Sequence, residues 1–267
     1  VPKARGGKWV KSGDVANTLN IFMLALNAGH RQKLQAAGAR FVVCLFDERV
    51  DFDRYGVFSQ DGHLHDIHVL LQCLFDIPDV GLVVKSQFQR NTPSQLYPED
   101  PVLYKAAQTG RYLELNLGAY LEPGRRHDRR WGERNVIYPA EAAMVADISV
   151  GNIVGATASL EAALVGCRSL LVDSHGLIRF NRDLYDKADV VYPSMELAID
   201  AIRELHHGNP SAAGLGDWTP IIDQFDSFRD GASALRLKSF LRRILESGEG
   251  LRHNRSFVSK FWRIRQV

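Results

Sequence analysis

Buried strands and amphipathic helices alternate along the first part of the chain. Residues 40–46, RFVVCLF, form a continuous apolar and β-branched run between a glycine and two acidic residues, as expected of a parallel strand covered on both faces. Residues 65–75 then carry apolar side chains at helical spacing, Pro78 ends this segment, and residues 81–87 resume as a strand. The pattern predicts a first strand–helix–strand unit.

The same alternation returns in the second half of the chain. The expected strands are 135–139, 147–151, 169–173 and 189–193, and the expected helices are 140–146, 159–165 and 195–206. Between the two halves, residues 91–130 show a clear helical pattern only at 102–108. Strands and helices that alternate at this spacing predict a parallel sheet with right-handed crossovers and helices on both faces. The predicted fold class is therefore a doubly wound, Rossmann-like α/β domain.

Two flanking segments depart from this alternation. Within residues 1–38, apolar side chains recur at near-helical spacing, which indicates a helix that enters the main domain. After residue 208 the chain is rich in Gly, Pro, Ser and Ala, and residues 233–246 have a further helical pattern. We therefore expect a main domain at 39–208, followed at 209–267 by a linker and a C-terminal helical tail.

Composition excludes several classes of protein. The 33 basic and 31 acidic residues leave a net charge of +2, far from the one-sided charge of a dedicated nucleic-acid binder. The three cysteines, Cys44, Cys73 and Cys167, lie in apolar runs, which fits buried thiols in a reducing compartment. The apolar stretches are much shorter than the roughly 20 residues that span a bilayer. These features predict a cytoplasmic protein without a nucleic-acid partner.

The most informative loop is GNIVGATASLEAALVG, at residues 151–166. In an open parallel sheet, ligands bind beyond the carboxyl ends of the strands, and this loop follows such an end. Gly155 relieves a tight turn, Thr157 and Ser159 offer hydroxyls, and a helix that opens near Ser159 presents free amides to a diphosphate. Glu161, expected in the first helical turn, could accept hydrogen bonds from ribose hydroxyls. The alternative is an N-capping serine followed by an early acidic residue.

Here a resemblance to a known family is visible. The segments YPAEAAMVADISVG and GATASLEAALVGCRSLLVDSHG resemble the second domain of GT-B glycosyltransferases, in particular those of surface-polysaccharide biosynthesis. By this similarity, the donor-binding positions fall on Thr157, Ser159 and Glu161, with the backbone of Tyr138 and Pro139 next to the base. The resemblance also implies that residues 1–38 are a remnant or linker helix from a missing N-terminal lobe.

The resemblance implies transfer of a sugar from a nucleotide-sugar donor to a surface polysaccharide or glycoconjugate, with this chain as the donor-binding half. The catalytic base is unassigned, because the family's first domain usually supplies it. A non-catalytic nucleotide-binding module, a sugar-nucleotide epimerase and a polyol-phosphate transferase of the same fold remain as alternatives. A nicotinamide-dependent dehydrogenase is disfavoured, because no Gly-x-Gly-x-x-Gly motif follows a first strand.

Other polar residues lie at the same predicted edge of the sheet. Lys85 ends a strand, where its ammonium could meet a donor phosphate or simply be solvated. Asp173 and His175 follow another strand and could lie near the donor or be ordinary loop residues. Asp47 and Glu48 could contact a ligand or cap the loop that they begin, and we favour capping.

Three histidines, His63, His65 and His68, crowd one predicted loop and helix start. Their spacing could bring two imidazoles together, as a metal site requires. No cysteine and no clear set of carboxylates completes the geometry of a metal site with these histidines. We therefore favour a cluster of surface histidines. We therefore expect no metal and no cofactor besides the nucleotide-sugar co-substrate.

A basic turn, GRRHDRR at residues 124–130, carries Arg125, Arg126, Arg129 and Arg130. Grouped arginines pair well with phosphates, so this turn could face an anionic lipid carrier or a membrane surface. A solvated loop is the alternative. The expected partners are thus a nucleotide-sugar donor and a glycan or lipid-linked acceptor, with peripheral contact at the inner face of the membrane.

Overall fold

The structure is a computed structural model that describes residues 29–48, 59–87, 92–115, 137–178, 182–228, 230 and 232–247. The described residues up to Phe225 belong to one compact unit, and those from Asp226 onward belong to a second.

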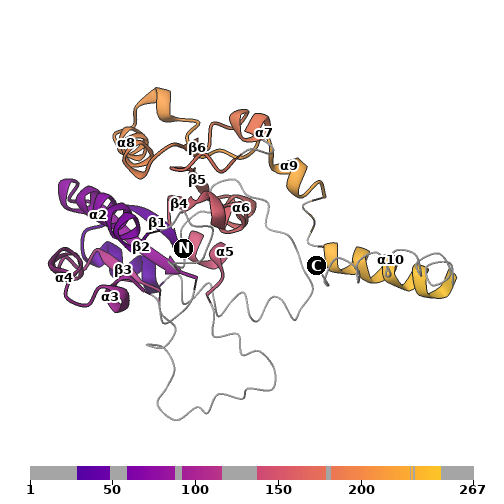
Figure 1. Ribbon diagram of the computed structural model, residues 1–267, viewed down its shortest axis with the longest axis horizontal. Helices are drawn as coiled ribbons and strands as arrows, with labels where there is room; N and C mark the ends of the chain where they lie inside the picture. Colours follow the sequence, from indigo (N-terminus) through magenta and orange to yellow (C-terminus); the bar gives the residue numbers. More distant parts are fainter. Residues whose placement is uncertain are drawn as a thin grey trace, which may run out of the picture. The chain divides into compact units, whose positions relative to one another are not determined.

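Within the described residues of the first unit, six strands form a fully parallel sheet (Figure 1). They are β1 (Phe41–Asp47), β2 (Val80–Ser86), β3 (Tyr112–Glu114), β4 (Ile148–Asn152), β5 (Arg168–Val172) and β6 (Val191–Tyr192). They lie in the order β3-β2-β1-β4-β5-β6, with Val43 of β1 opposite Leu82 of β2 and Ile148 of β4. This is the strand order of a doubly wound, Rossmann-like sheet, so the predicted fold class is confirmed.

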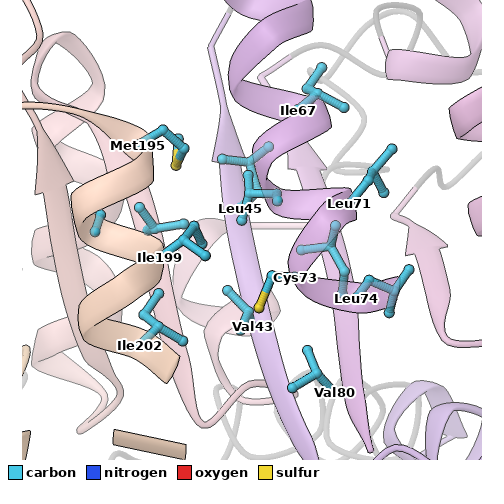
Figure 2. Packing of buried hydrophobic residues seen from close by; sticks show 14 of the residues in the cluster. Val43, Leu45, Ile67, Leu71, Cys73, Leu74, Val80, Met195, Ile199 and Ile202 are labelled. Atoms are coloured by element: carbon cyan, nitrogen blue, oxygen red, sulfur yellow. The ribbon is translucent and has the colours of Figure 1, made fainter. Parts of the chain in front are cut away.

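One face of the sheet packs against amphipathic helices. They are α2 (Gln60–Asp76), α4 (Pro101–Gln108), which follows the short α3 (Pro93–Leu96), and α8 (Met195–His206). Figure 2 shows Ile67 and Leu71 of α2 and Ile199 of α8 around Val43 and Leu45 of β1. All five side chains are buried, because the helical spacing of the apolar positions points one stripe of each helix at the sheet.

The other face packs against residues 29–36, which are helical, α5 (Pro139–Ala143) and α6 (Ala156–Leu164). Leu34 and Ala162 meet Phe46 of β1 there. Arg31 holds the first helical segment in place, since its guanidinium lies 2.9 Å from Asp147, whose carboxylate also accepts from the Val42 amide at 2.8 Å. The end of the segment 1–38 is therefore packed into this unit.

The segment after residue 208 also packs on the sheet. Trp218 is buried with Ile221 and Ile222 against Leu171, and its indole donates to the Ser169 carbonyl at 2.8 Å. The nearby helices are α7 (Arg182–Asp186) and α9 (Ile222–Phe225). The compact unit thus ends at Phe225 rather than at residue 208, because an apolar cluster follows the small-residue stretch that predicted a linker.

Two local predictions need correction. The helix expected from residue 159 begins at Ala156, because the Asn152 side chain accepts from the Val154 amide and starts a 3-10 turn that runs directly into α6. Glu161 consequently lies in the second helical turn and not in the first. Residues 137 and 138, expected in a strand, have no regular structure and lead into α5. Residues 135 and 136 lie outside the described residues.

The second unit contains α10 (Ser233–Ser247), which confirms the predicted helical tail. In the described residues, no helix is both long and apolar enough to cross a bilayer.

Candidate functional site

The order of the strands creates a crevice beside β1. From β1 the chain continues to β2 and β3 on one side of the sheet, and from β4 it continues to β5 and β6 on the other side. The loops that follow β1 and β4 therefore diverge, and this switch point is where open parallel sheets bind ligands.

A cavity of about 280 Å³ lies at this position. Its walls come from the carboxyl end of β1, from Asn152 at the end of β4, from the loop after β5, and from the first turns of α2 and α8. The polar residues in its lining are Asp47, Glu48, Ser59, His63, His65, Asp66, Asn152, Ser174, His175, Ser194 and Glu196.

A hydrogen-bonded group formed by Asp47, His63, Ser86 and Tyr97 lies at one end of the cavity. The buried Asp47 carboxylate meets His63 Nε2 at 2.5 Å and accepts from the Ser86 hydroxyl at 2.8 Å. Tyr97 donates to the Gln60 carbonyl at 3.1 Å, so its oxygen accepts from His63 Nδ1 at 2.7 Å. His63 thus lies between Asp47 and Tyr97, with one ring nitrogen within hydrogen-bond distance of each. Burial and the charge of Asp47 raise the pKa of Tyr97 to about 12.

A second set of charges joins α2 to α8 at the mouth of the cavity. His65 Nε2 lies 2.6 Å from Glu196 Oε1, and this hydrogen bond lowers the pKa of Glu196 to about 2. Burial raises the pKa of Asp66 to about 6, despite the opposing effect of His65. Two of the cavity carboxylates, Asp47 and Glu196, thus contact imidazoles, and Asp66 is more easily protonated than an ordinary aspartic acid.

Two helix N-termini also open on the cavity. Ser59 caps α2 by accepting from the Gly62 amide at 3.0 Å, and Ser194 caps α8 by accepting from the Leu197 amide at 3.3 Å. Both caps line the cavity. The partial positive charge of each N-terminus favours an anionic or strongly polar ligand between them.

The start of α6, which the sequence singled out, is close to the cavity but is packed more tightly than expected. A Cβ at Gly155 would overlap the Glu48 carboxylate, which therefore lies directly against this N-terminus. Thr157 is exposed in the first turn. Ser159 is fully buried, with its hydroxyl 3.4 Å from the Leu170 carbonyl, so it binds the sheet rather than facing the cavity.

Lys85 and Glu161 lie on the α5 and α6 face of the sheet. Lys85 is buried and donates to the Ser86 carbonyl at 2.5 Å. Burial lowers the pKa of Lys85, and the nearby carboxylates, Glu161 among them, act in the opposite direction. Burial also raises the pKa of Glu141, with a smaller contribution from Glu161. Lys85 is therefore a buried cation among acidic residues and not a solvated strand end.

Tyr138 and Pro139 form the start of α5. The Tyr138 amide donates to Glu141 Oε2 at 2.8 Å, and the Tyr138 side chain is 43% exposed. Pro139 occupies the first helical position, where its missing amide costs nothing. Neither residue lines the cavity.

Asp173 and His175 have different places in the loop after β5. Both carboxylate oxygens of Asp173 accept loop amides, from Leu177 at 2.7 Å and Ile178 at 3.0 Å, so Asp173 shapes the loop. That loop carries Ser174 and the exposed His175 to the cavity.

The three histidines of the predicted cluster contact three different carboxylates. His63 meets Asp47, His65 meets Glu196, and His68 lies 2.9 Å from Asp100. Among the residues that the structure describes, no group of three metal-ligating side chains could hold an ion. The predicted arginine turn at 124–130 lies outside the described ranges.

Fold and cavity together define a doubly wound, Rossmann-like α/β protein with a ligand crevice at the switch point of its sheet. No protein-family model and no curated protein matches the sequence. A similar solved structure is the C-terminal domain of a Glycosyl Transferase Group 1 Family Protein (LpcC) from Francisella tularensis, with a TM-score of 0.45 and 14% identity. The similarity covers 74% of this chain and 92% of that one.

Proposed function

We propose that the cavity at the switch point binds the nucleotide part of a nucleotide-sugar donor, and that the chain is the donor-binding half of a glycosyltransferase. The observation that carries this proposal is the position of the cavity, beyond the carboxyl ends of β1 and β4 and between two capped helix N-termini. Its volume of about 280 Å³ is at the lower end for a complete small-molecule site. A cavity of this volume is compatible with a cleft between two lobes of which this chain forms one wall.

The charges in the cavity are compatible with a phosphorylated ligand. Asp47 is hydrogen-bonded to His63, Glu196 is hydrogen-bonded to His65, and Asp66 has a pKa of about 6. Imidazoles and helix amides therefore lie beside these carboxylates as donors for a phosphate. No metal is needed to hold a diphosphate in such a setting, and we propose none.

Glu48 occupies the position where a phosphate would meet the first amides of α6. Its carboxylate lies against Gly155, so a bound phosphate has to displace it. Because like charges repel at this contact, we expect Glu48→Gln to bind nucleoside diphosphates more tightly, by roughly fivefold, which corresponds to about 1 kcal/mol at a helix N-terminus.

The resemblance of residues 138–176 to surface-polysaccharide glycosyltransferases supports the sugar-transfer part of the proposal. It makes Glu161 a donor-binding position, and we propose that this carboxylate, which is partly accessible and lies near the buried Lys85, binds the ribose hydroxyls. Thr157 can reach a ligand from the exposed first turn of α6, whereas the buried Ser159 would act only by fixing that helix to β5. The acceptor that we propose is a glycan or a lipid-linked sugar.

Calorimetric titration of the purified chain with UDP, CDP, CMP, GDP and ADP tests this function. We expect saturable binding of one of these nucleotides, weaker binding by Glu161→Ala and tighter binding by Glu48→Gln. Glu99→Ala removes an exposed carboxylate that does not line the cavity and is the matched control. Absence of binding to any nucleotide, or identical affinities in all variants, would refute the proposed site.

A further inference from the structure

Helix α10 in the second unit carries a row of exposed apolar side chains. Leu237, Phe240 and Leu241 follow one another at the spacing of a single helical face, and they are 57%, 52% and 49% exposed. A water-exposed helix normally keeps polar residues at such positions, so an apolar partner is expected on this face.

Cations border both sides of this apolar face. At 3.6 residues per turn, Arg236 and Arg243 lie along one side of it, and Lys238 and Arg242 lie along the other. The sequence has no carboxylate between Leu235 and Arg243. Asp230 pairs with Arg236 at 2.7 and 2.8 Å, so this arginine is held near the start of the helix.

Arg236 also covers an aromatic ring. Its guanidinium carbon lies 4.0 Å from the centroid of the Phe228 ring, and Phe228 is itself 65% exposed. Phe228 thereby adds an aromatic ring to the exposed apolar surface of this unit. Together, Phe228, Leu237, Phe240 and Leu241 form what we call the α10 apolar face.

We propose that the α10 apolar face inserts into the surface of an anionic lipid bilayer, with its four cations at the level of the lipid phosphates. A second copy of the helix would bring Lys238, Arg242 and Arg243 close to the same cations of its partner, which disfavours self-pairing even though Asp230 compensates Arg236. An anionic bilayer instead offers both an apolar interior and negative headgroups. A helix of 15 residues is about 22 Å long, too short for a hydrocarbon core of about 30 Å, so it lies in the plane of the interface.

Co-sedimentation of the full chain with vesicles tests this proposal. Vesicles of phosphatidylcholine are compared with vesicles in which a third of the lipid, roughly the anionic share that sets a strong surface potential, is phosphatidylglycerol. We expect binding to the anionic vesicles only, with loss of binding as salt is raised. Leu237→Ser combined with Leu241→Ser, and separately Lys238→Gln combined with Arg242→Gln, should each lower the partition coefficient about tenfold or more.

The matched control is Arg182→Gln combined with Lys187→Gln, two exposed cations of the first unit. It changes the net charge as much as the α10 pair does, and it should bind within about twofold of the unaltered chain. Circular dichroism checks that each variant keeps the fold. Equal binding to neutral vesicles, equal loss in the control, or a dimer that Leu237→Ser with Leu241→Ser dissociates in the absence of lipid binding would each overturn the proposal.

Discussion

The buried contact between Asp47 and His63 provides the sharpest test of how the cavity is built. The side chains are 3% and 10% exposed and their closest atoms are 2.5 Å apart. His63→Ala leaves the Asp47 carboxylate buried, with the Ser86 hydroxyl still donating to it. Breaking a buried pair on one side costs about 3 to 5 kcal/mol, and we expect about 3 kcal/mol here because Ser86 stays.

A double-mutant cycle separates this pair from the loss of packing. His63→Ala, Asp47→Ala and the double variant are unfolded in urea, and the free energy of unfolding is extrapolated to water. We expect a coupling energy of about 2 kcal/mol, since each single substitution removes the same charge-assisted hydrogen bond from a buried setting.

The matched cycle uses His65→Ala and Glu196→Ala. This pair has a similar distance of 2.6 Å, but its side chains are 62% and 48% exposed. Its coupling energy should stay below about 1 kcal/mol. Two outcomes would contradict this reasoning: an Asp47–His63 cycle that is additive within about 0.5 kcal/mol, or the same coupling energy in both cycles. Either one would show that the buried Asp47–His63 pair does not organise the cavity.

The fold could be predicted because its strands are buried on both faces. The apolar run at residues 40–46 corresponds closely to β1 (Phe41–Asp47), since a continuous apolar stretch is rarely buried in any other way in a globular domain. β3 was not predicted, because it has only three residues and lies at the edge of the sheet, with two of them partly exposed. Short edge strands carry little sequence pattern.

The candidate site could be predicted only in part. Among the predicted donor-binding residues, His175 lines the cavity. Asp47 and Glu48 line it as well, although their positions in the sequence favoured loop capping. The sequence could not pair Asp47 with Ser86, which is 39 residues away, because that contact depends on the register of two strands. The N-termini of α2 and α8 were also missed as walls, although Ser59 and Ser194 carry the capping signal that could have found them.

Three further predictions concern stability. Burial raises the pKa of Asp66 to about 6 from 3.8, so its contribution to the free energy of unfolding is fully present below about pH 4 and is lost as the pH rises through 6. Over this range, Asp66→Asn should become increasingly more stable than the unaltered chain. A difference between their urea midpoints that does not change with pH would contradict this. Leu71→Ala, at a fully buried position between α2 and the sheet, should lower the free energy of unfolding by about 3 kcal/mol in the same urea assay, and a loss below about 1 kcal/mol would show that this packing is incorrect. Ser194→Ala removes the cap of α8 and should cost about 1 kcal/mol, which thermal unfolding measures, whereas Ser194→Asp should retain most of the stability; equal losses in both would exclude the capping role.

The proposed function requires that a nucleotide occupies the crevice where β1 and β4 end. Hydrogen–deuterium exchange of the full chain, with and without the nucleotide that binds most tightly in calorimetry, measures this occupancy. We expect slower exchange in peptides that cover the first turns of α2, α6 and α8, the segments around Gly62, Gly155 and Glu196. Protection confined to other parts of the chain, with these three segments unchanged at saturating nucleotide, would contradict it.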